Sequence, residues 1–134
     1  LMGCNFVSSQ RDMKQAPETY CPPKIAFHLE YILDADEIII HVVKQKKSSL
    51  ILWPEYLIAT NKRLIFCIQE IFGNRVNSYE YLWKYIGECI IIKRVTSTTL
   101  LIQLLNGEQV KANYLPNKPA ALLYNFITKK IASK

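Results

Sequence analysis

Three lysines that lie close together have the most evident binding chemistry in this sequence. Lys44, Lys46 and Lys47 occur in a polar segment, residues 44–49, that follows an apolar run. Ammonium groups on one loop can hold phosphate groups as point charges. Three interpretations are open: a specific site for a phosphorylated headgroup, a weak attraction to anionic surfaces, or a solvated loop without a ligand.

A group of aromatic residues provides a second candidate site. Tyr79, Tyr81 and Trp83 alternate along a predicted strand, so their side chains would share one face of it. An exposed aromatic face is typical of an interface with a protein partner or with a second copy of the chain. The alternative is that Trp83 is a core residue. We expect no nucleic-acid binding, because Arg and Lys are not interleaved with these aromatic residues.

The first residues of the sequence allow two kinds of lipidation. If Met2 is the initiator, Gly3 would be available for myristoylation and Cys4 for palmitoylation, although Val7 stands where that motif prefers Ser or Thr. If a signal peptide precedes the segment, Cys4 would be the lipidated residue of a bacterial lipoprotein. The third interpretation is an ordinary terminus without a lipid.

The sequence contains no motif for catalysis, a metal or a cofactor. His28 and His41 have no cysteine or carboxylate at metal-ligand spacing, and no Ser/His/Asp pattern is present. The four cysteines form no CxxC pair, and Cys67 and Cys89 lie in apolar runs, which favours free thiols in a reducing compartment. We therefore expect a protein that is not an enzyme and has no cofactor. It would be cytoplasmic and peripheral at the membrane, with lipoprotein anchoring through Cys4 as the alternative.

The composition indicates one globular domain with a basic surface. The chain has 134 residues, of which 50% are hydrophobic and 21% are charged. Its 17 Lys and Arg residues exceed its 11 Asp and Glu residues, giving a net charge of +6. This excess favours an anionic partner such as a membrane surface or a phosphorylated ligand. No apolar run approaches the roughly 18–20 residues that span a bilayer.

The hydrophobic pattern predicts a helix at each end of a β-rich domain. Residues 1–23 form a polar, aperiodic segment, which we interpret as a flexible N-terminal arm, and residues 24–134 would form the folded domain. Apolar residues at helical spacing predict a short helix over residues 24–33. A longer amphipathic helix is predicted over residues 117–131, with Asn117 as its N-cap.

About seven strands are predicted between these helices. Thr60-Asn61-Lys62-Arg63 would be a tight turn, in which Asn61 tolerates left-handed φ and Arg63 has a structural role. Asn106-Gly107 predicts a second hairpin, with positive φ at both positions. The segments that would form strands are residues 38–43, 56–59, 64–69, 76–83, 86–94, 99–105 and 108–115, and residues 50–53 are a further apolar piece.

The segment from about residue 29 to residue 132 resembles the bacterial pleckstrin-homology-like domains and, more distantly, the GRAM domains of eukaryotes. Leu33-Asp34-Ala35-Asp36-Glu37-Ile38 is similar to the family's Leu-x-x-x-Glu-x segment before the first strand. Leu57-Ile58-Ala59-Thr60-Asn61-Lys62-Arg63-Leu64-Ile65-Phe66 is similar to its Leu-x-x-Thr-Asn-x-Arg-Leu-Ile-Phe hairpin. The third similar feature is the last hairpin with its helix, residues 100–131.

The resemblance implies a seven-stranded bent β-sandwich or partial barrel that a C-terminal helix caps, without catalysis. Family members bind phosphoinositides, peptides or other subunits. The loop of Lys44, Lys46 and Lys47 is where phosphoinositide-binding members place basic residues, but the following segment, Leu50-Ile51-Leu52-Trp53, lacks their alternating basic pair. The resemblance therefore implies a binding module for an anionic membrane surface or phospholipid headgroup, or alternatively a protein-interaction or self-assembly module.

Overall fold

The computed structural model contains two antiparallel sheets and describes residues 21–46, 53–70 and 75–134. Lys47 and residues 50–52 of the apolar piece 50–53 lie outside these ranges. The described elements are, in chain order, α2 (Pro23–Ile32), β1 (Ile39–Lys44), β2 (Glu55–Thr60), β3 (Arg63–Gln69), β4 (Val76–Leu82), the 3-10 helix η1 (Trp83–Tyr85), β5 (Ile86–Lys93), β6 (Thr98–Leu104), β7 (Gln109–Leu115) and α3 (Asn117–Ala132).

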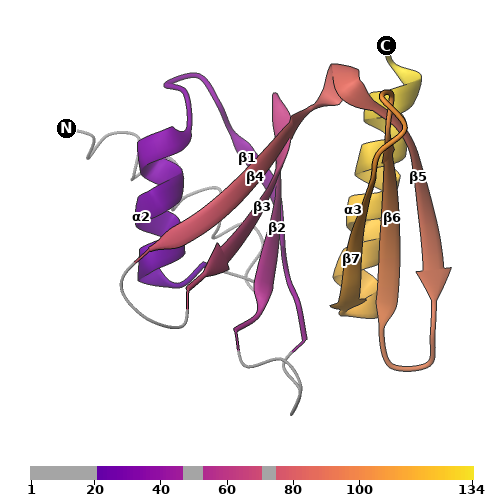
Figure 1. Cartoon of the computed structure of the whole chain (residues 1–134), viewed down its shortest axis with the longest axis horizontal. Coiled ribbons are helices and arrows are strands. Elements are labelled where there is room, and N and C mark those ends of the chain that lie inside the picture. Colours follow the sequence, from indigo (N-terminus) through magenta and orange to yellow (C-terminus); the bar gives the residue numbers. More distant parts are fainter. Residues whose placement is uncertain (1–20, 47–52, 71–74) are drawn as a thin grey trace.

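The seven strands form a four-stranded and a three-stranded sheet. The first has the order β1-β2-β3-β4 and the second the order β5-β6-β7. The chain passes from one sheet to the other through η1, and α3 packs against β5, β6 and β1 (Figure 1). This architecture confirms the predicted bent sandwich with a C-terminal helix and a short N-terminal helix.

The main core lies between the two sheets and includes one face of α3. Leu57 in β2 and Leu64 and Phe66 in β3 point into this core from the first sheet. Full burial of such side chains contributes about 1.5–3 kcal/mol each. The second sheet and α3 provide the fully buried side chains of Ile86, Leu100, Ile102, Leu115, Leu123 and Ile127.

Helix α2 covers the outer face of the four-stranded sheet (Figure 1). Ile25 and Leu29 of α2 are fully buried and pack in one cluster with the outward-facing Ile58 and Ile65. Cys21, just before α2, is buried in the same cluster. Because both faces of β2 and β3 are covered, these strands appear in the sequence as continuous apolar runs rather than as alternating ones.

Three asparagines that the sequence assigns to turns or a cap act through their side chains instead. Among the described residues, only Tyr114 and Gly107 have positive φ, at 58° and 95°, so the left-handed φ predicted for Asn61 and Asn106 is wrong. The side chain of Asn106 accepts a hydrogen bond from the amide of Glu108 at 2.9 Å. The N-cap of α3 is Pro116, not Asn117.

Candidate functional site

The turn between β2 and β3 is organised by the hydroxyl group of Thr60. It accepts hydrogen bonds from the backbone amides of Lys62 and Arg63, both at 3.0 Å. It also donates a hydrogen bond to Oε2 of Glu37 at 2.6 Å. One hydroxyl group thus closes the turn and attaches it to the segment before β1.

The next two residues of the turn bind the same segment. Asn61 accepts a hydrogen bond from the amide of Ile38 at 2.8 Å and donates one to the carbonyl of Asp36 at 3.3 Å. Lys62 forms ion pairs with Asp34 at 3.2 Å and Asp36 at 2.7 Å. We call the interacting residues the clasp; they are Asp34, Asp36, Glu37, Ile38 and the turn Thr60, Asn61, Lys62 and Arg63.

Arg63 is the most highly connected residue of the clasp. Its Nη2 donates to Oε1 of Glu37 at 2.7 Å and to the carbonyl of Ile32 at 2.8 Å, and its Nη1 pairs with the carboxylate of Glu80. Burial would raise the pKa of Glu37, but hydrogen bonds from Arg63 and Thr60 outweigh burial and hold that pKa below its usual value. The structural role predicted for Arg63 is confirmed.

The predicted lysine site lies at the opposite end of β1. Lys44 is the last residue of β1 and is half-buried, whereas Lys46 is exposed. The Nζ of Lys46 donates a hydrogen bond to the carbonyl of Thr96, in the turn between β5 and β6, at 2.5 Å. The structure therefore places two of the three predicted lysines, and it connects one of them to the second sheet.

A bulge in β7 holds the lysine segment in place. The amide of Lys46 donates to the carbonyl of Tyr114 at 2.7 Å, and the side chain of Gln45 donates to the carbonyl of Asn113 at 2.9 Å. Tyr114 has a φ of 58°, which a bulky residue rarely adopts, and it lies beside a register shift between β6 and β7. The bulge thus aims a carbonyl group at the end of β1 and joins the two sheets there.

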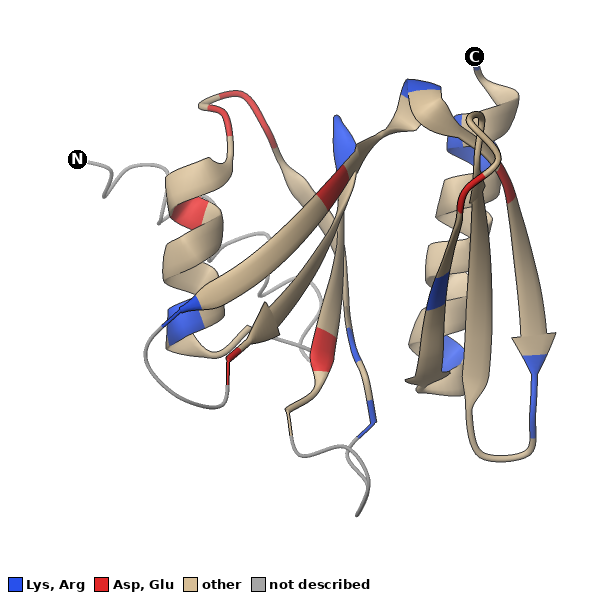
Figure 2. Ribbon diagram, in the orientation of Figure 1, with Lys and Arg blue, Asp and Glu red and all other residues tan. Residues whose placement is uncertain are grey.

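Three further basic residues come from distant parts of the sequence to the same end. Lys93 is the last residue of β5, Arg94 follows it, and Lys118 is in the first turn of α3. The side chain of Asn117 donates to the carbonyls of Arg94 and Val95 at 3.5 and 3.3 Å, which fixes the start of α3 beside the β5–β6 turn. We call Lys44, Lys46, Lys93, Arg94 and Lys118 the basic end. Figure 2 shows Lys and Arg segments near the lower ends of both sheets.

No acidic side chain in the described part of the chain forms an ion pair with the basic end. There, every ion pair involves Lys62 or Arg63 of the clasp, and none involves a basic-end residue. Glu55, at the same end, has a pKa that burial raises, which disfavours its charged form. The basic end can therefore attract an anion without first breaking an ion pair among these residues.

The predicted aromatic face is divided between the core and the surface. Trp83 begins η1 and is buried; its Nε1 donates to the carbonyl of Thr60 at 3.0 Å. Tyr81 is half-buried and packs edge to face against Phe66, with ring centroids 5.8 Å apart. Tyr79 is 59% exposed. An exposed face can therefore use Tyr79 and the edge of Tyr81, but not Trp83.

The remaining predicted positions have no assigned role. Gly3 and Cys4 lie outside the described residues. Cys21, Cys67 and Cys89 are free and buried, and burial raises the pKa of each thiol to about 12. In residues 21–46, 53–70 and 75–134, no group of His, Cys, Asp and Glu is arranged to hold a metal ion, and no helix is both long and apolar enough to cross a membrane.

Comparison with known proteins identifies the family. Residues 33–129 match the family described as Bacterial PH domain; the matched segment begins just after α2 and ends within α3. Among solved structures, the chain is similar to the pleckstrin homology (PH) domain of USP37, with 10% identity, a TM-score of 0.46, and coverage of 73% of this chain and 98% of that chain. No curated protein matches the chain. The family match extends over well more than half of the sequence, and the chain therefore belongs to the bacterial PH domain family.

Proposed function

We propose that this chain is a non-catalytic binding module that associates with anionic phospholipid surfaces through its basic end. PH domains are in general binding modules, and they commonly bind lipids or proteins. The observation that carries the proposal is the collection of cations from β1, β5 and α3 at one end of the sandwich, without ion-pair partners among the described residues.

The arrangement of these cations favours attraction to a surface over recognition of one headgroup. The side chains come from three separate segments, and the Nζ of Lys46 already donates to the carbonyl of Thr96. Each Lys or Arg near an anionic leaflet contributes about 1 kcal/mol. Several such contributions give reversible binding that decreases as salt screens the charges.

The N-terminal segment would strengthen this association. The sequence assigns residues 24–134 to the folded module and residues 1–23 to an arm, but Cys21 is buried beside α2 and Pro23 begins that helix. In this proposal the arm therefore ends before Cys21. A lipid on Gly3 or Cys4 would supply a second membrane signal, and stable anchoring requires two such signals. In this proposal the protein is cytoplasmic and peripheral at the membrane.

Co-sedimentation with lipid vesicles tests the proposal. Vesicles of phosphatidylcholine alone and with phosphatidylserine are mixed with the protein at low and high salt. We expect binding only to the anionic vesicles, and weaker binding at high salt. Replacing Lys46 and Lys93 by Gln should weaken binding about 30-fold, since two contributions of about 1 kcal/mol are lost.

The matched control neutralises two lysines at the other end of the molecule. Lys84 in η1 and Lys129 near the end of α3 are both exposed, and the change Lys84→Gln with Lys129→Gln alters the net charge equally. We expect this variant to bind vesicles nearly as well as the original protein. Equal losses in both variants would mean that net charge, and not the basic end, controls binding. No binding to any vesicle would refute the proposal and favour the protein-interaction alternative.

A further inference from the structure

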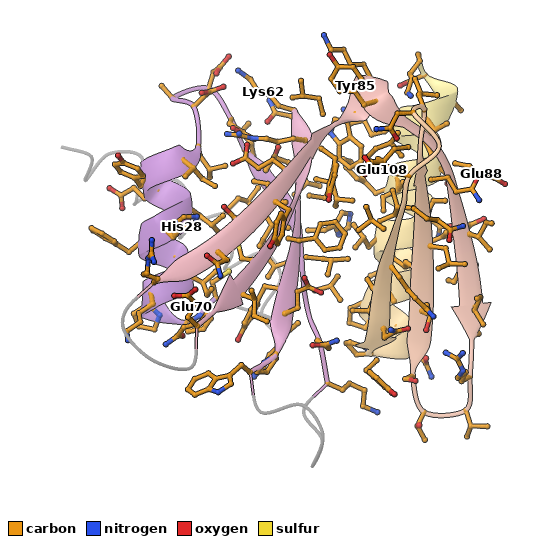
Figure 3. The ribbon with its side chains drawn as sticks, in the orientation of Figure 1. His28, Lys62, Glu70, Tyr85, Glu88 and Glu108 are labelled. Atoms are coloured by element: carbon orange, nitrogen blue, oxygen red, sulfur yellow. The ribbon has the colours of Figure 1, made fainter. Side chains whose placement is uncertain are left out.

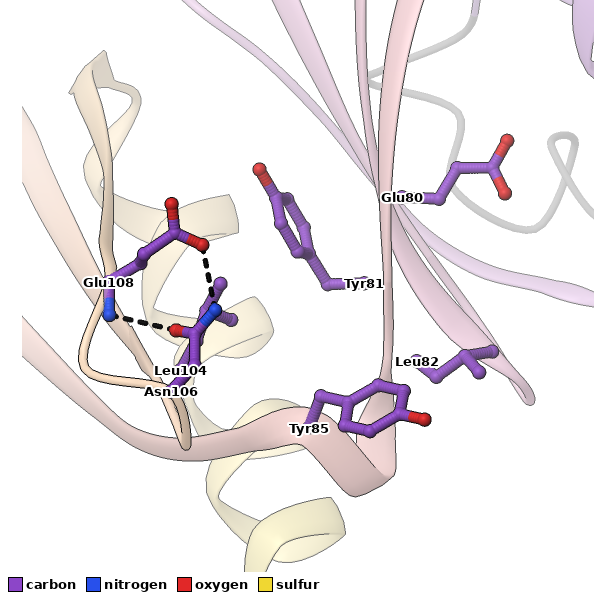
Figure 4. Close-up of a pocket in the computed structure, with 7 residues that line it drawn as sticks. All are labelled: Glu80, Tyr81, Leu82, Tyr85, Leu104, Asn106 and Glu108. Atoms are coloured by element: carbon purple, nitrogen blue, oxygen red, sulfur yellow. Dashed lines mark hydrogen bonds between the residues drawn. The ribbon is translucent and has the colours of Figure 1, made fainter.

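A pocket of about 360 Å³ lies between β4 and the hairpin of β6 and β7. Figure 4 shows the ring of Tyr81 pointing from β4 towards Leu104 and Glu108, while Glu80 points to the other side of the strand. The pocket lies near the turn of Asn106, at the opposite end of the hairpin from the basic end. Its lining residues are Glu80, Tyr81, Leu82, Tyr85, Leu104, Asn106 and Glu108.

Two of the strands beside this pocket, β4 and β7, have a free edge within the described structure. β4 pairs with β3 and with no other strand, and β7 pairs only with β6. An unpaired strand edge presents backbone amide and carbonyl groups that an added strand can bind. The edge of β4 is therefore open to an extended peptide.

The charge of the pocket is opposite to that of the chain. Although the chain has a net charge of +6, the residues that line the pocket include two glutamates and no Lys or Arg. Glu80 is neutralised by its ion pair with Arg63. Glu108 accepts a hydrogen bond from Asn106 at 2.8 Å and has no cationic partner among the described residues. Burial, followed by the negative charge of Glu108, raises the pKa of Tyr81.

Large apolar side chains are exposed around the pocket. Tyr79 is 59% exposed, Leu82 42%, Tyr85 52% and Leu105 66%. Leu105 lies next to Tyr85, since its amide donates to the Tyr85 carbonyl at 2.9 Å. Large exposed apolar side chains grouped around a polar site are typical of an interaction surface.

We infer that this surface binds an extended basic peptide, which pairs with the free edge of β4 and places a Lys or Arg side chain against Glu108. Alternate apolar side chains of the peptide contact Leu82 and Tyr85, because successive residues of a strand point to opposite sides. This peptide site goes beyond the proposed membrane association and shares no residue with the basic end. Either one can fail without the other.

Selection from a displayed library of random 12-residue peptides tests the inference. The full chain is the target, and the affinities of selected peptides are measured for the original protein, Glu108→Gln and Glu88→Gln. The change Glu108→Gln keeps the oxygen that accepts the hydrogen bond from Asn106 but removes the charge. Glu88 is the matched control, because it is exposed on β5 and its side chain points away from the sandwich (Figure 3).

We expect the selected peptides to alternate apolar residues with Lys or Arg. Loss of the Glu108 charge should weaken their binding about fivefold, whereas Glu88→Gln should leave it unchanged. Amide chemical shifts should change at residues 79–82 and 104–108 on binding. The amide spectrum of the Glu108→Gln variant without peptide checks that the variant is folded.

Three results would overturn the inference: no selected peptide, peptides that bind Glu108→Gln equally well, or shift changes confined to the basic end. Self-association that Glu108→Gln abolishes would make a second copy the occupant, and would also overturn it.

Discussion

The clasp and the basic end both carry cations, but only the cations of the clasp form ion pairs within the described structure. In the clasp, Lys62 and Arg63 form ion pairs with four carboxylates of the α2–β1 segment and β4. At the basic end, the described cations have hydrogen bonds to uncharged groups or no side-chain partner. Charges that are compensated within the fold stabilise it, whereas uncompensated charges on a surface are available to a partner.

The sequence motif that resembles the family lies in the clasp and not at the basic end. The Thr-Asn-Lys-Arg motif is the most recognisable part of the chain, and each of its residues contacts the segment before β1. The motif and the Leu-x-x-x-Glu-x segment are therefore two halves of one structural unit. Such a motif identifies the fold and leaves the ligand undetermined.

Substitution of Arg63 by Met should have the largest effect on stability. It leaves Glu37, whose side chain is fully buried, without its cationic partner, and loss of one member of a buried ion pair costs about 3–5 kcal/mol. The free energy of unfolding in urea measures this loss. The matched substitution at the basic end, Lys93→Met, should change stability by less than about 0.5 kcal/mol. Similar losses for both variants would contradict the distinction between the two ends.

Substitution of Asn117 by Ala should have an intermediate effect. Its side chain accepts a hydrogen bond from the buried hydroxyl of Thr98 at 2.5 Å and donates to the β5–β6 turn. Loss of these contacts should destabilise the protein by about 1–2 kcal/mol in urea unfolding. The control is Asn125→Ala, an exposed position on the same helix, where we expect a change within about 0.5 kcal/mol. An unchanged stability for Asn117→Ala would exclude this role.

Lowering the pH should reduce the free energy of unfolding through protonation of Glu37. We expect this effect to be smaller than those of the Arg63 and Asn117 substitutions. The pKa of Glu37 is lower in the folded protein than its usual value of 4.5, so the unfolded chain binds the proton more readily. The stability that this group contributes is present above about pH 5 and is lost as the pH falls through its folded-state pKa. Urea unfolding at several pH values should show a shallower decline for Glu37→Gln. An identical decline would mean that other groups cause the acid sensitivity.

Much of the fold could be predicted from the sequence, because hydrophobic periodicity and turn residues determine it locally. The hairpins at Thr60–Arg63 and Asn106-Gly107 and the helix over residues 24–33 all occur in the structure. The role of α2 could not be predicted, because a short amphipathic stripe does not indicate which surface it will cover. The apolar outward-facing Ile58 and Ile65 were the signal that a second layer exists.

The candidate sites were predictable only in part. Lys44 and Lys46 could be recognised as neighbours, but Lys93, Arg94 and Lys118 join them only through the pairing of strands and the hydrogen bonds of Asn117. Alternation assigned Trp83 to the same face as Tyr79 and Tyr81. Tyr81 and Trp83 do contact the same core, but alternation could not show that the strand ends at Leu82 and that Trp83, at the start of η1, is buried.

The central claim is that the basic end faces the membrane and the clasp does not. Amide spectra of the protein bound to nanodiscs of anionic lipid, with a spin label on a fraction of the headgroups, test the claim directly. We expect paramagnetic broadening at residues 44–46, 93–96 and 117–118, and little at residues 60–63 and 106–108. Broadening concentrated at residues 60–63 and 106–108, or spread evenly over the surface, would contradict the account.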